Sequence, residues 1–306
     1  MPGNTQNEKQ LEALRQELEA VKQELAHMEK RFMERIEKAE RRAYKKLPLT
    51  ELRFEFHLVE HCNLNCKGCN HFSPIAEPAF LSLGSLERDM KKLSELFDAK
   101  AEDIRLLGGE PLLHPELIDC MRITRAYWPT ARIRLITNGV LLMNMDESFW
   151  DACREYRICI APTKYPIPVD YDAAEARARE KGVAYEYFND TSEEKSLYRL
   201  PVSLTGGNDP RKSFFCCGQA NYSVFLRDGK LYPCCLIPTI HHFNKRFHTD
   251  LEVTESDCID IYSGASAEEI LEFLSNPRPF CKYCDPDHKI YGMKWERSKG
   301  ESEEWI

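Results

Sequence analysis

The feature that most constrains the fold is a regular alternation of short apolar runs and amphipathic stretches after Pro48. The apolar runs have the length of β-strands, and the stretches between them repeat hydrophobic residues at helical spacing. The pattern predicts strands over Leu52–Val59, Asp103–Leu107, Ala131–Thr137, Arg157–Ala161 and Ala184–Tyr187, and helices over Leu83–Asp98, Pro115–Tyr127, Asp146–Glu155 and Asp172–Lys181. Repeated strand–helix units favour an α/β fold with a parallel sheet that is closed or partly closed.

Three short motifs stand where the first three predicted strands end. Cys62, Cys66 and Cys69 form a CxxxCxxC run after the first strand. The run Gly108-Gly109-Glu110-Pro111 follows the second strand, and Ile136-Thr137-Asn138-Gly139 ends the third. Function in parallel sheets gathers at the carboxyl ends of the strands, so we expect these motifs to share one site.

The three cysteines of the first motif indicate a metal site. Thiolates at this spacing suit zinc or an iron–sulfur cluster. Three protein ligands leave one coordination position open, and an open position is where a small molecule can be activated. The alternatives are a zinc site or a chance cluster of thiols.

Composition narrows the function classes. The net charge is −8 and no Lys/Arg-rich block stands out in the folded region, so binding of nucleic acid through a basic face is not expected. We find no signal peptide pattern and no apolar stretch long enough for a membrane span, so a soluble, cytoplasmic protein is expected. The thirteen cysteines are an odd number and are partly clustered. This arrangement favours metal ligation in a reducing compartment over a disulfide framework.

Residues 8–46 have the pattern of a coiled-coil helix. They contain neither glycine nor proline, and apolar residues recur every three or four positions at Leu11, Leu14, Leu18, Val21, Leu25, Met28 and Phe32. We therefore expect residues 1–47 to form one helical segment that self-associates or binds a helical partner. The charges that flank the seam leave the partner and its orientation open.

The alternation stops near Thr205, where a cysteine-rich module is expected. Asn221–Tyr232 has the pattern of a β-hairpin that turns at residues 227–230. Six cysteines surround it: Cys216, Cys217, Cys234, Cys235, Cys281 and Cys284. We therefore divide the chain into residues 1–47, 48–204, 205–290 and 291–306. The last segment carries Trp295 and Trp305 and is expected either to dock on the body or to stay mobile.

Together, the three strand-end motifs resemble those of the radical S-adenosylmethionine (SAM) enzymes over roughly residues 50–190. The resemblance implies a partial (β/α)6 TIM-like barrel and a reducing electron donor such as flavodoxin or ferredoxin. It also implies that Cys62, Cys66 and Cys69 hold a [4Fe-4S] cluster that binds SAM. By the same resemblance Gly108, Gly109 and Glu110 contact the methionyl ammonium group, and Thr137, Asn138 and Gly139 line the SAM site. Gly68 stands where the family commonly has an aromatic residue, a role that His71 or Phe72 would take here.

The second module resembles the Twitch and SPASM domains of such enzymes. Cys217, Gly229 and Cys234 match the opening C-x(9–15)-G-x4-C pattern, and Cys281 and Cys284 supply two further thiols. No cysteine follows Cys284, so the likeness is to a Twitch domain with one auxiliary [4Fe-4S] cluster. The ligands we predict are Cys217, Cys234, Cys281 and Cys284. Cys216 or Cys235 are alternatives, and a structural zinc ion is the competing interpretation.

These features favour an oxidoreductase that acts on a small hydroxylated molecule such as a sugar, a sugar nucleotide or a cyclitol. The reaction would be dehydrogenation or epimerisation. We expect His71, Lys164 and Tyr165 near the substrate, and Cys159 either as a hydrogen donor that faces the barrel lumen or as a packed core residue. Two alternatives stay open: an enzyme of peptide maturation, and a non-catalytic iron–sulfur scaffold or redox sensor.

Overall fold

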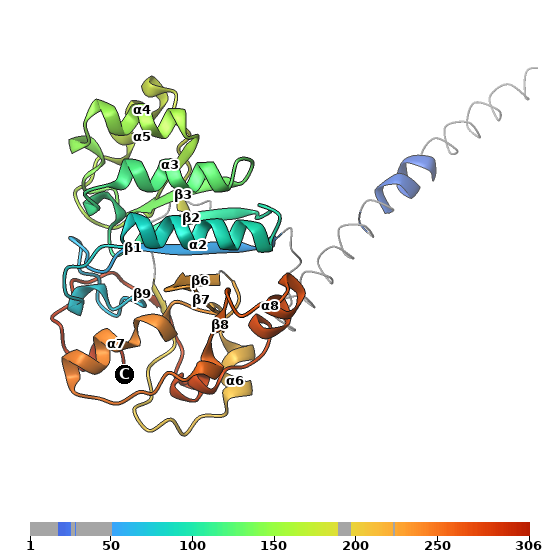
Figure 1. Cartoon of the computed structure of the whole chain (residues 1–306), viewed down its shortest axis with the longest axis vertical. Coiled ribbons are helices and arrows are strands. Elements are labelled where there is room, and N and C mark those ends of the chain that lie inside the picture. Colours follow the sequence, from blue (N-terminus) through green and yellow to red (C-terminus); the bar gives the residue numbers. More distant parts are fainter. Residues whose placement is uncertain (1–17, 26–27, 29–50, 189–196, 223) are drawn as a thin grey trace, which may run out of the picture. The chain divides into compact units, whose positions relative to one another are not determined.

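The computed structural model describes residues 18–25, 28, 51–188, 197–222 and 224–306 (Figure 1). The chain divides into two units, Met1–Tyr44 and Lys45–Ile306. In the first unit, residues 18–25 are helical, and Leu18, Val21, Leu25 and Met28 are each more than half exposed. The rest of the predicted coiled coil lies outside the described residues, so the coiled coil stays a prediction. Among the described residues, no helix is long and apolar enough to cross a membrane.

The second unit is built on a seven-stranded sheet with the order β4-β3-β2-β1-β6-β7-β8. Strands β1 to β4 and β6 pair in parallel, whereas β7 and β8 pair antiparallel. The strands are β1 Arg53–Val59, β2 Asp103–Gly108, β3 Arg132–Thr137, β4 Ile158–Pro162, β6 Val224–Arg227, β7 Lys230–Tyr232 and β8 Ile259–Asp260. This mostly parallel α/β arrangement confirms the predicted fold class, a partial TIM-like barrel.

Three helices connect the first four strands, a fourth follows the last of them, and these helices cover one face of the sheet (Figure 1). They are α2 Leu83–Leu96, α3 Leu117–Tyr127, α4 Glu147–Glu155 and α5 Tyr171–Lys181. Side chains of Ser82, Asp146 and Asp170 cap the amino ends of α2, α4 and α5 by accepting backbone N–H bonds. These caps explain why the helices begin within a few residues of where the sequence pattern predicts.

Alternation along the strands separates an apolar face from a polar one. Phe54, Phe56, Ile104 and Leu106 belong to the main core, which includes buried residues of α2 and α3. Successive residues of a strand point to opposite faces, so the intervening residues face the interior of the partial barrel. One row of these residues pairs across the strands: Phe225 on β6, Glu55 on β1, Arg105 on β2, Arg134 on β3 and Cys159 on β4.

The cysteine-rich module continues the sheet from β1. The predicted hairpin is present as β6 and β7, which turn at Asp228 and Gly229. Its helices are α6 Pro210–Cys216, α7 Leu236–Phe247 and α8 Ala267–Leu274, and a small separate sheet pairs β5 Leu197–Arg199 with β9 Ile290–Met293. A second core of mainly aromatic and aliphatic residues joins this module to Phe72, Val202 and Trp305.

Two expectations are resolved by the fold. The strand predicted over Ala184–Tyr187 is wrong as a full strand, because only Tyr185 forms a bridge to Ile160 of β4. Tyr185 instead donates its hydroxyl to the Tyr171 carbonyl (3.3 Å), and its ring lies against Tyr187. The last segment docks on the body: Trp305 is 1% exposed, and its ring packs against Phe72.

Candidate functional site

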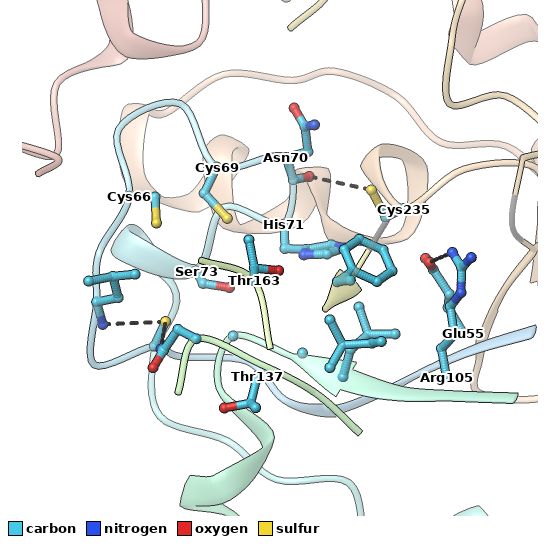
Figure 2. Close-up of a pocket in the computed structure, with 18 of the residues that line it drawn as sticks. Glu55, Cys66, Cys69, Asn70, His71, Ser73, Arg105, Thr137, Thr163 and Cys235 are labelled. Atoms are coloured by element: carbon cyan, nitrogen blue, oxygen red, sulfur yellow. Dashed lines mark hydrogen bonds and ion pairs between the residues drawn. The ribbon is translucent and has the colours of Figure 1, made fainter. Parts of the chain in front are cut away.

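The three thiols of the first motif lie in the loop after β1 and line one cavity of about 530 Å³ (Figure 2). The end of β1 positions this loop against the end of β2. The backbone N–H of Gly109 donates to the Val59 carbonyl (2.7 Å), and that of Glu110 donates to the His61 carbonyl (3.1 Å). The structure thus brings the first two strand-end motifs together around one cavity.

N–H groups surround the sulfurs. The backbone of Leu64 donates to Cys62 Sγ (3.4 Å), and the Asn138 side chain donates to the same atom (3.6 Å). The indole of Trp295 donates to Cys66 Sγ (3.2 Å). Such donors stabilise sulfur that carries negative charge, so this environment suits thiolate ligands.

Two of the thiols differ in how readily they ionise. Burial raises the pKa of Cys62 from 9.0 to about 12. Burial opposes ionisation of Cys69 as well, but hydrogen bonding and charge from His71 outweigh it and lower its pKa to about 7. Metal ligation requires the thiolate, and Cys69 therefore reaches the binding form more readily than Cys62 near neutral pH.

Gly108 and Gly109 line the cavity with backbone alone. Gly108 has φ +150°, and a Cβ there would lie 2.4 Å from the Val59 carbonyl oxygen. A Cβ on Gly109 would lie 1.9 Å from the His61 carbonyl oxygen. Only glycine therefore allows the loops after β1 and β2 to approach this closely.

We predict that Gly109→Ala destabilises the chain by about 1–3 kcal/mol, because backbone atoms on both sides must move apart. Gly84→Ala is the matched control. Gly84 lies on α2 with nothing within 4 Å of its added Cβ, so this change is expected to stabilise by about 0.5–1 kcal/mol. Urea denaturation followed by circular dichroism measures both. Equal stability of the two variants would contradict the close loop contact.

Glu110 lies behind these glycines and ties the second and third motifs together. Its side chain is fully buried and accepts from Leu112 N (3.1 Å), Thr137 Oγ1 (2.7 Å) and Asn138 N (2.9 Å). Burial raises its pKa to about 7, although these hydrogen bonds act in the opposite direction. Glu110 is not among the residues that line the cavity, so its contact with an ammonium group stays a prediction.

Thr137 and Asn138 line the cavity, whereas Gly139 does not. Gly139 adopts φ +81° beside the ring of Tyr171, whose hydroxyl donates to the Asn138 carbonyl (3.0 Å). Asn138 in turn donates its side-chain amide to Asn63 Oδ1 (2.7 Å). The third motif therefore closes around the loop that carries the thiols.

The residues predicted near the substrate divide into two groups. His71 and Tyr165 line the cavity. Lys164 and Cys159 are not among the lining residues, although Cys159 lies on the sheet face that contains Glu55 and Arg105. Cys159 is 5% exposed, and burial raises its pKa to about 11.

A buried charge network between β1, β2 and β3 was missed by sequence reasoning. Arg105 donates to Asp103 (2.8 Å) and to Glu55 (3.0 Å), and Arg134 donates through Nε to Asp103 (2.9 Å). The Tyr222 ring lies 5.3 Å from the Arg105 guanidinium carbon. Glu55, Arg105 and Tyr222 all line the cavity. The sequence feature that could have revealed this network is the alternation of charged and apolar residues in these strands, which is typical of strands with one polar face.

The thiols of the second module also gather at one place. Burial raises the pKa of Cys234 and of Cys284, and both interact electrostatically with Cys217 and Cys281. Cys234 and Cys235 line the same cavity as the first motif. Burial, together with the nearby Cys234, Glu55 and Cys69, raises the pKa of Cys235, and its thiol donates to the Asn70 carbonyl (3.9 Å; Figure 2). Cys216 is exposed.

Two buried polar atoms in the cavity lack a partner within the described part of the chain. They are Nε2 of His71 and the hydroxyl of Ser73, a residue that is 2% exposed. Buried polar atoms are nearly always hydrogen-bonded in native proteins, so unpaired ones beside a cavity indicate a ligand or water. Together with the three thiols and the two glycines, they fit a cluster-bound polar molecule such as SAM.

Residues 57–190 match the family model described as the radical SAM superfamily. This part of the chain, with its three thiols after β1 and its paired glycines after β2, is a radical SAM domain. The cofactors of the superfamily are SAM and a [4Fe-4S] cluster.

Curated relatives share short stretches of sequence with this chain. The GTP 3',8-cyclase of Microcystis aeruginosa (strain NIES-843 / IAM M-2473) is 33% identical over 99 residues, 31% of this chain and 30% of the relative. Molybdenum cofactor biosynthesis protein 1 of Bos taurus is 33% identical over 89 residues, 29% of this chain and 14% of the relative. The chain thus spans less than a third of the length of these relatives.

Solved structures resemble the chain over a longer stretch. BtrN in complex with AdoMet and 2-DOIA has 19% identity and a TM-score of 0.46, and the match covers 75% of this chain and 84% of that one. Native anSMEcpe with bound AdoMet has 13% identity and a TM-score of 0.45, with 76% and 83% covered.

Proposed function

We propose that the protein is a radical SAM enzyme that oxidises a small hydroxylated molecule such as a sugar, a sugar nucleotide or a cyclitol. The observation that carries the proposal is one cavity with three kinds of lining. The cavity is lined by the thiols of the first motif, by Cys234 of the second module, and by the charged side chains of Glu55 on β1 and Arg105 on β2. Hydrogen abstraction, electron removal and substrate binding are thereby supported in one place.

The residues of the cavity have distinct roles in this proposal. Cys62, Cys66 and Cys69 would hold the [4Fe-4S] cluster, and the backbone at Gly108 and Gly109 would admit SAM. When bound and reduced, this pair supplies a 5′-deoxyadenosyl radical that abstracts hydrogen from an unactivated C–H bond. Exclusion of water by the surrounding protein would protect a reactive species from side reactions.

The polar lining supports a hydroxylated substrate. A hydroxyl group both donates and accepts, so it can pair with the Glu55 carboxylate and the Arg105 guanidinium at the same time. The rings of Phe188 and Tyr222 also line the cavity and suit the apolar face of a sugar or cyclitol ring. A volume of about 530 Å³ is in the range of small-molecule sites.

We assign Cys217, Cys234, Cys281 and Cys284 to an auxiliary [4Fe-4S] cluster. A tetrahedral zinc site has Zn–S bonds of about 2.3 Å, which brings its sulfurs to roughly 3.8 Å from one another. In the described part of the chain, no three cysteine sulfurs lie within 4.8 Å of one another. This spacing is compatible with a group larger than a single zinc ion. A site held entirely by protein thiolates beside the cavity suits electron acceptance, and hence dehydrogenation.

Epimerisation is the second candidate, and Cys235 favours it. Epimerisation requires a hydrogen donor that returns a hydrogen atom to the substrate carbon. Cys235 lines the cavity, and burial raises its pKa well above the usual value, which keeps the thiol protonated. Cys159, the donor proposed from sequence, is not among the lining residues, so Cys235 replaces it as the candidate.

The test is anaerobic reconstitution, dithionite reduction and mass spectrometry with a panel of sugars, sugar nucleotides and cyclitols. Dehydrogenation predicts 5′-deoxyadenosine and a product lighter by two hydrogens. Epimerisation predicts a product of unchanged mass that takes up deuterium from heavy water. GTP belongs in the panel because curated relatives are named GTP 3',8-cyclases. If the fully loaded, reduced chain forms no 5′-deoxyadenosine, the enzyme proposal fails.

Cys234→Ala is expected to lose the iron of the auxiliary cluster and to stop substrate oxidation. It should keep SAM cleavage, because the first thiol set is intact. Cys216→Ala is the matched control and should keep its iron, since Cys216 is exposed and outside the assigned set. Iron analysis per chain measures both. If Cys216→Ala loses iron instead, Cys216 and not Cys217 would be the ligand from that pair of adjacent cysteines.

A further inference from the structure

A second cleft, of about 780 Å³, is lined in part by Asn65 of the loop that carries the three thiols. Its charged lining consists of four permanent cations, two carboxylates and three histidines: Arg227, Lys245, Arg246, Lys299, Glu60, Glu77, His241, His242 and His248. The whole chain carries a net charge of −8, so this basic cleft is a local exception.

Both carboxylates of the cleft are already paired. Glu60 accepts from His242 (2.6 Å) and forms an ion pair with Arg227 (3.2 Å). Glu77 forms an ion pair with Lys245 (2.7 Å). Arg246 and Lys299 are exposed, and within the described residues neither side chain forms an ion pair. The cleft therefore presents unneutralised positive charge to a partner.

The cleft lies close to the thiols. Asn65, between Cys62 and Cys66 in the chain, lines the cleft, and Pro74 lines both the cleft and the inner cavity. The Asn65 carbonyl accepts from Ser298 N (2.8 Å), which brings the segment with Lys299 onto the loop. A protein bound in the cleft would thus be separated from the thiol site by little more than this loop.

We propose that the cleft is the docking surface for an acidic one-electron carrier protein that reduces the radical SAM site. The proposal rests on the proposed function, because only SAM cleavage requires this electron. The carrier loses one electron and the site gains it, and no bond forms or breaks at the docking surface. Complementary charge steers encounter and fixes orientation, and short electron-transfer distances follow from the position of the cleft.

A nucleic acid or a free phosphate is a weaker occupant for this cleft. Both would be attracted by Arg246 and Lys299, but neither carries an electron to the adjacent thiols. An acidic carrier satisfies both the charge of the cleft and its location. These other anions serve as alternative outcomes in the test.

The test variant is Arg246→Glu combined with Lys299→Glu, and Arg179→Glu is the matched control. Arg179 lies on α5, which follows the strand at the opposite edge of the sheet, and its side chain is 80% exposed. The probe is an acidic flavodoxin. Binding of the oxidised flavodoxin is measured by biolayer interferometry at low and high salt, and 5′-deoxyadenosine formation is measured with reduced flavodoxin or with dithionite.

We expect the double variant to bind flavodoxin about tenfold or more weakly at low salt and to lose most of the salt dependence. With dithionite as the reductant, the double variant should form 5′-deoxyadenosine at the same rate as the wild type and Arg179→Glu. Unchanged flavodoxin binding in the double variant overturns the proposal. The proposal is also overturned if inorganic phosphate or DNA weakens flavodoxin binding at constant ionic strength while the double substitution leaves flavodoxin binding unchanged. Loss of the dithionite rate in the wild type would instead reject the proposed function.

Discussion

A chain with alanine at Cys62, Cys66 and Cys69 is expected to form no 5′-deoxyadenosine and to hold about four fewer iron atoms per chain than the wild type. The three sulfurs line one cavity and receive N–H donors, and under the proposed function they are the cluster ligands on which SAM cleavage depends. Iron analysis after anaerobic reconstitution, together with chromatography of the nucleoside product, measures the two effects separately.

Cys153→Ala is the control for this variant. Cys153 lies in the main core on α4, and burial alone raises its pKa to about 12, so it is not expected to bind iron. Its loss should leave both iron content and SAM cleavage at wild-type levels. An unchanged iron content in the triple variant would show that the ligands have been divided wrongly between the two sites.

Arg105→Ala is expected to destabilise the chain by about 3–5 kcal/mol, because it removes the buried cation that pairs with the carboxylates of Asp103 and Glu55. In this variant Asp103, which is 1% exposed, still pairs with Arg134. Glu55 has no other cationic partner among its described contacts. The midpoint of urea unfolding should therefore fall strongly. Substrate binding should be lost as well, since Arg105 lines the cavity.

Two further variants show whether burial of the network causes the loss. Arg122→Ala breaks an exposed pair with Asp119 (3.0 Å), and exposed pairs contribute about 0–1 kcal/mol. Arg105→Met combined with Glu55→Gln removes both charges of one pair and should recover part of the stability. A similar loss in Arg105→Ala and Arg122→Ala would mean that the buried network contributes little.

Local sequence pattern was sufficient for most of the α/β region. The helix predicted over Asp172–Lys181 is α5, and the strand predicted over Asp103–Leu107 is β2 with one added residue. Periodicity and capping act within a few residues of the chain, so they can be read without a structure. The segment predicted as a strand over Ala184–Tyr187 pairs with β4 only around Tyr185, through hydrogen bonds between Ile160 and the backbone of Ala184 and Glu186. The Tyr187 ring packs against Tyr171 of α5, a contact that local pattern does not reveal.

The candidate site was predicted only in part, for the same reason. Its thiols and glycines belong to compact motifs, and the structure places most of them around one cavity. Glu55 and Arg105 are 50 residues apart, and their pairing depends on the register of β1 and β2. The approach of Cys235 to the first motif depends on β6 joining the sheet beside β1. Neither of these two contacts can be predicted from a local sequence pattern.

The contact between Trp295 and Cys66 joins residues 229 positions apart in the chain. A ribosome therefore completes the thiol loop long before it makes the indole that lies against it. Trp305, which donates to the Cys69 carbonyl (2.9 Å), is made later still. During that interval the loop has no indole cover, and iron and sulfide delivered to the nascent chain would reach thiols that the finished protein partly encloses.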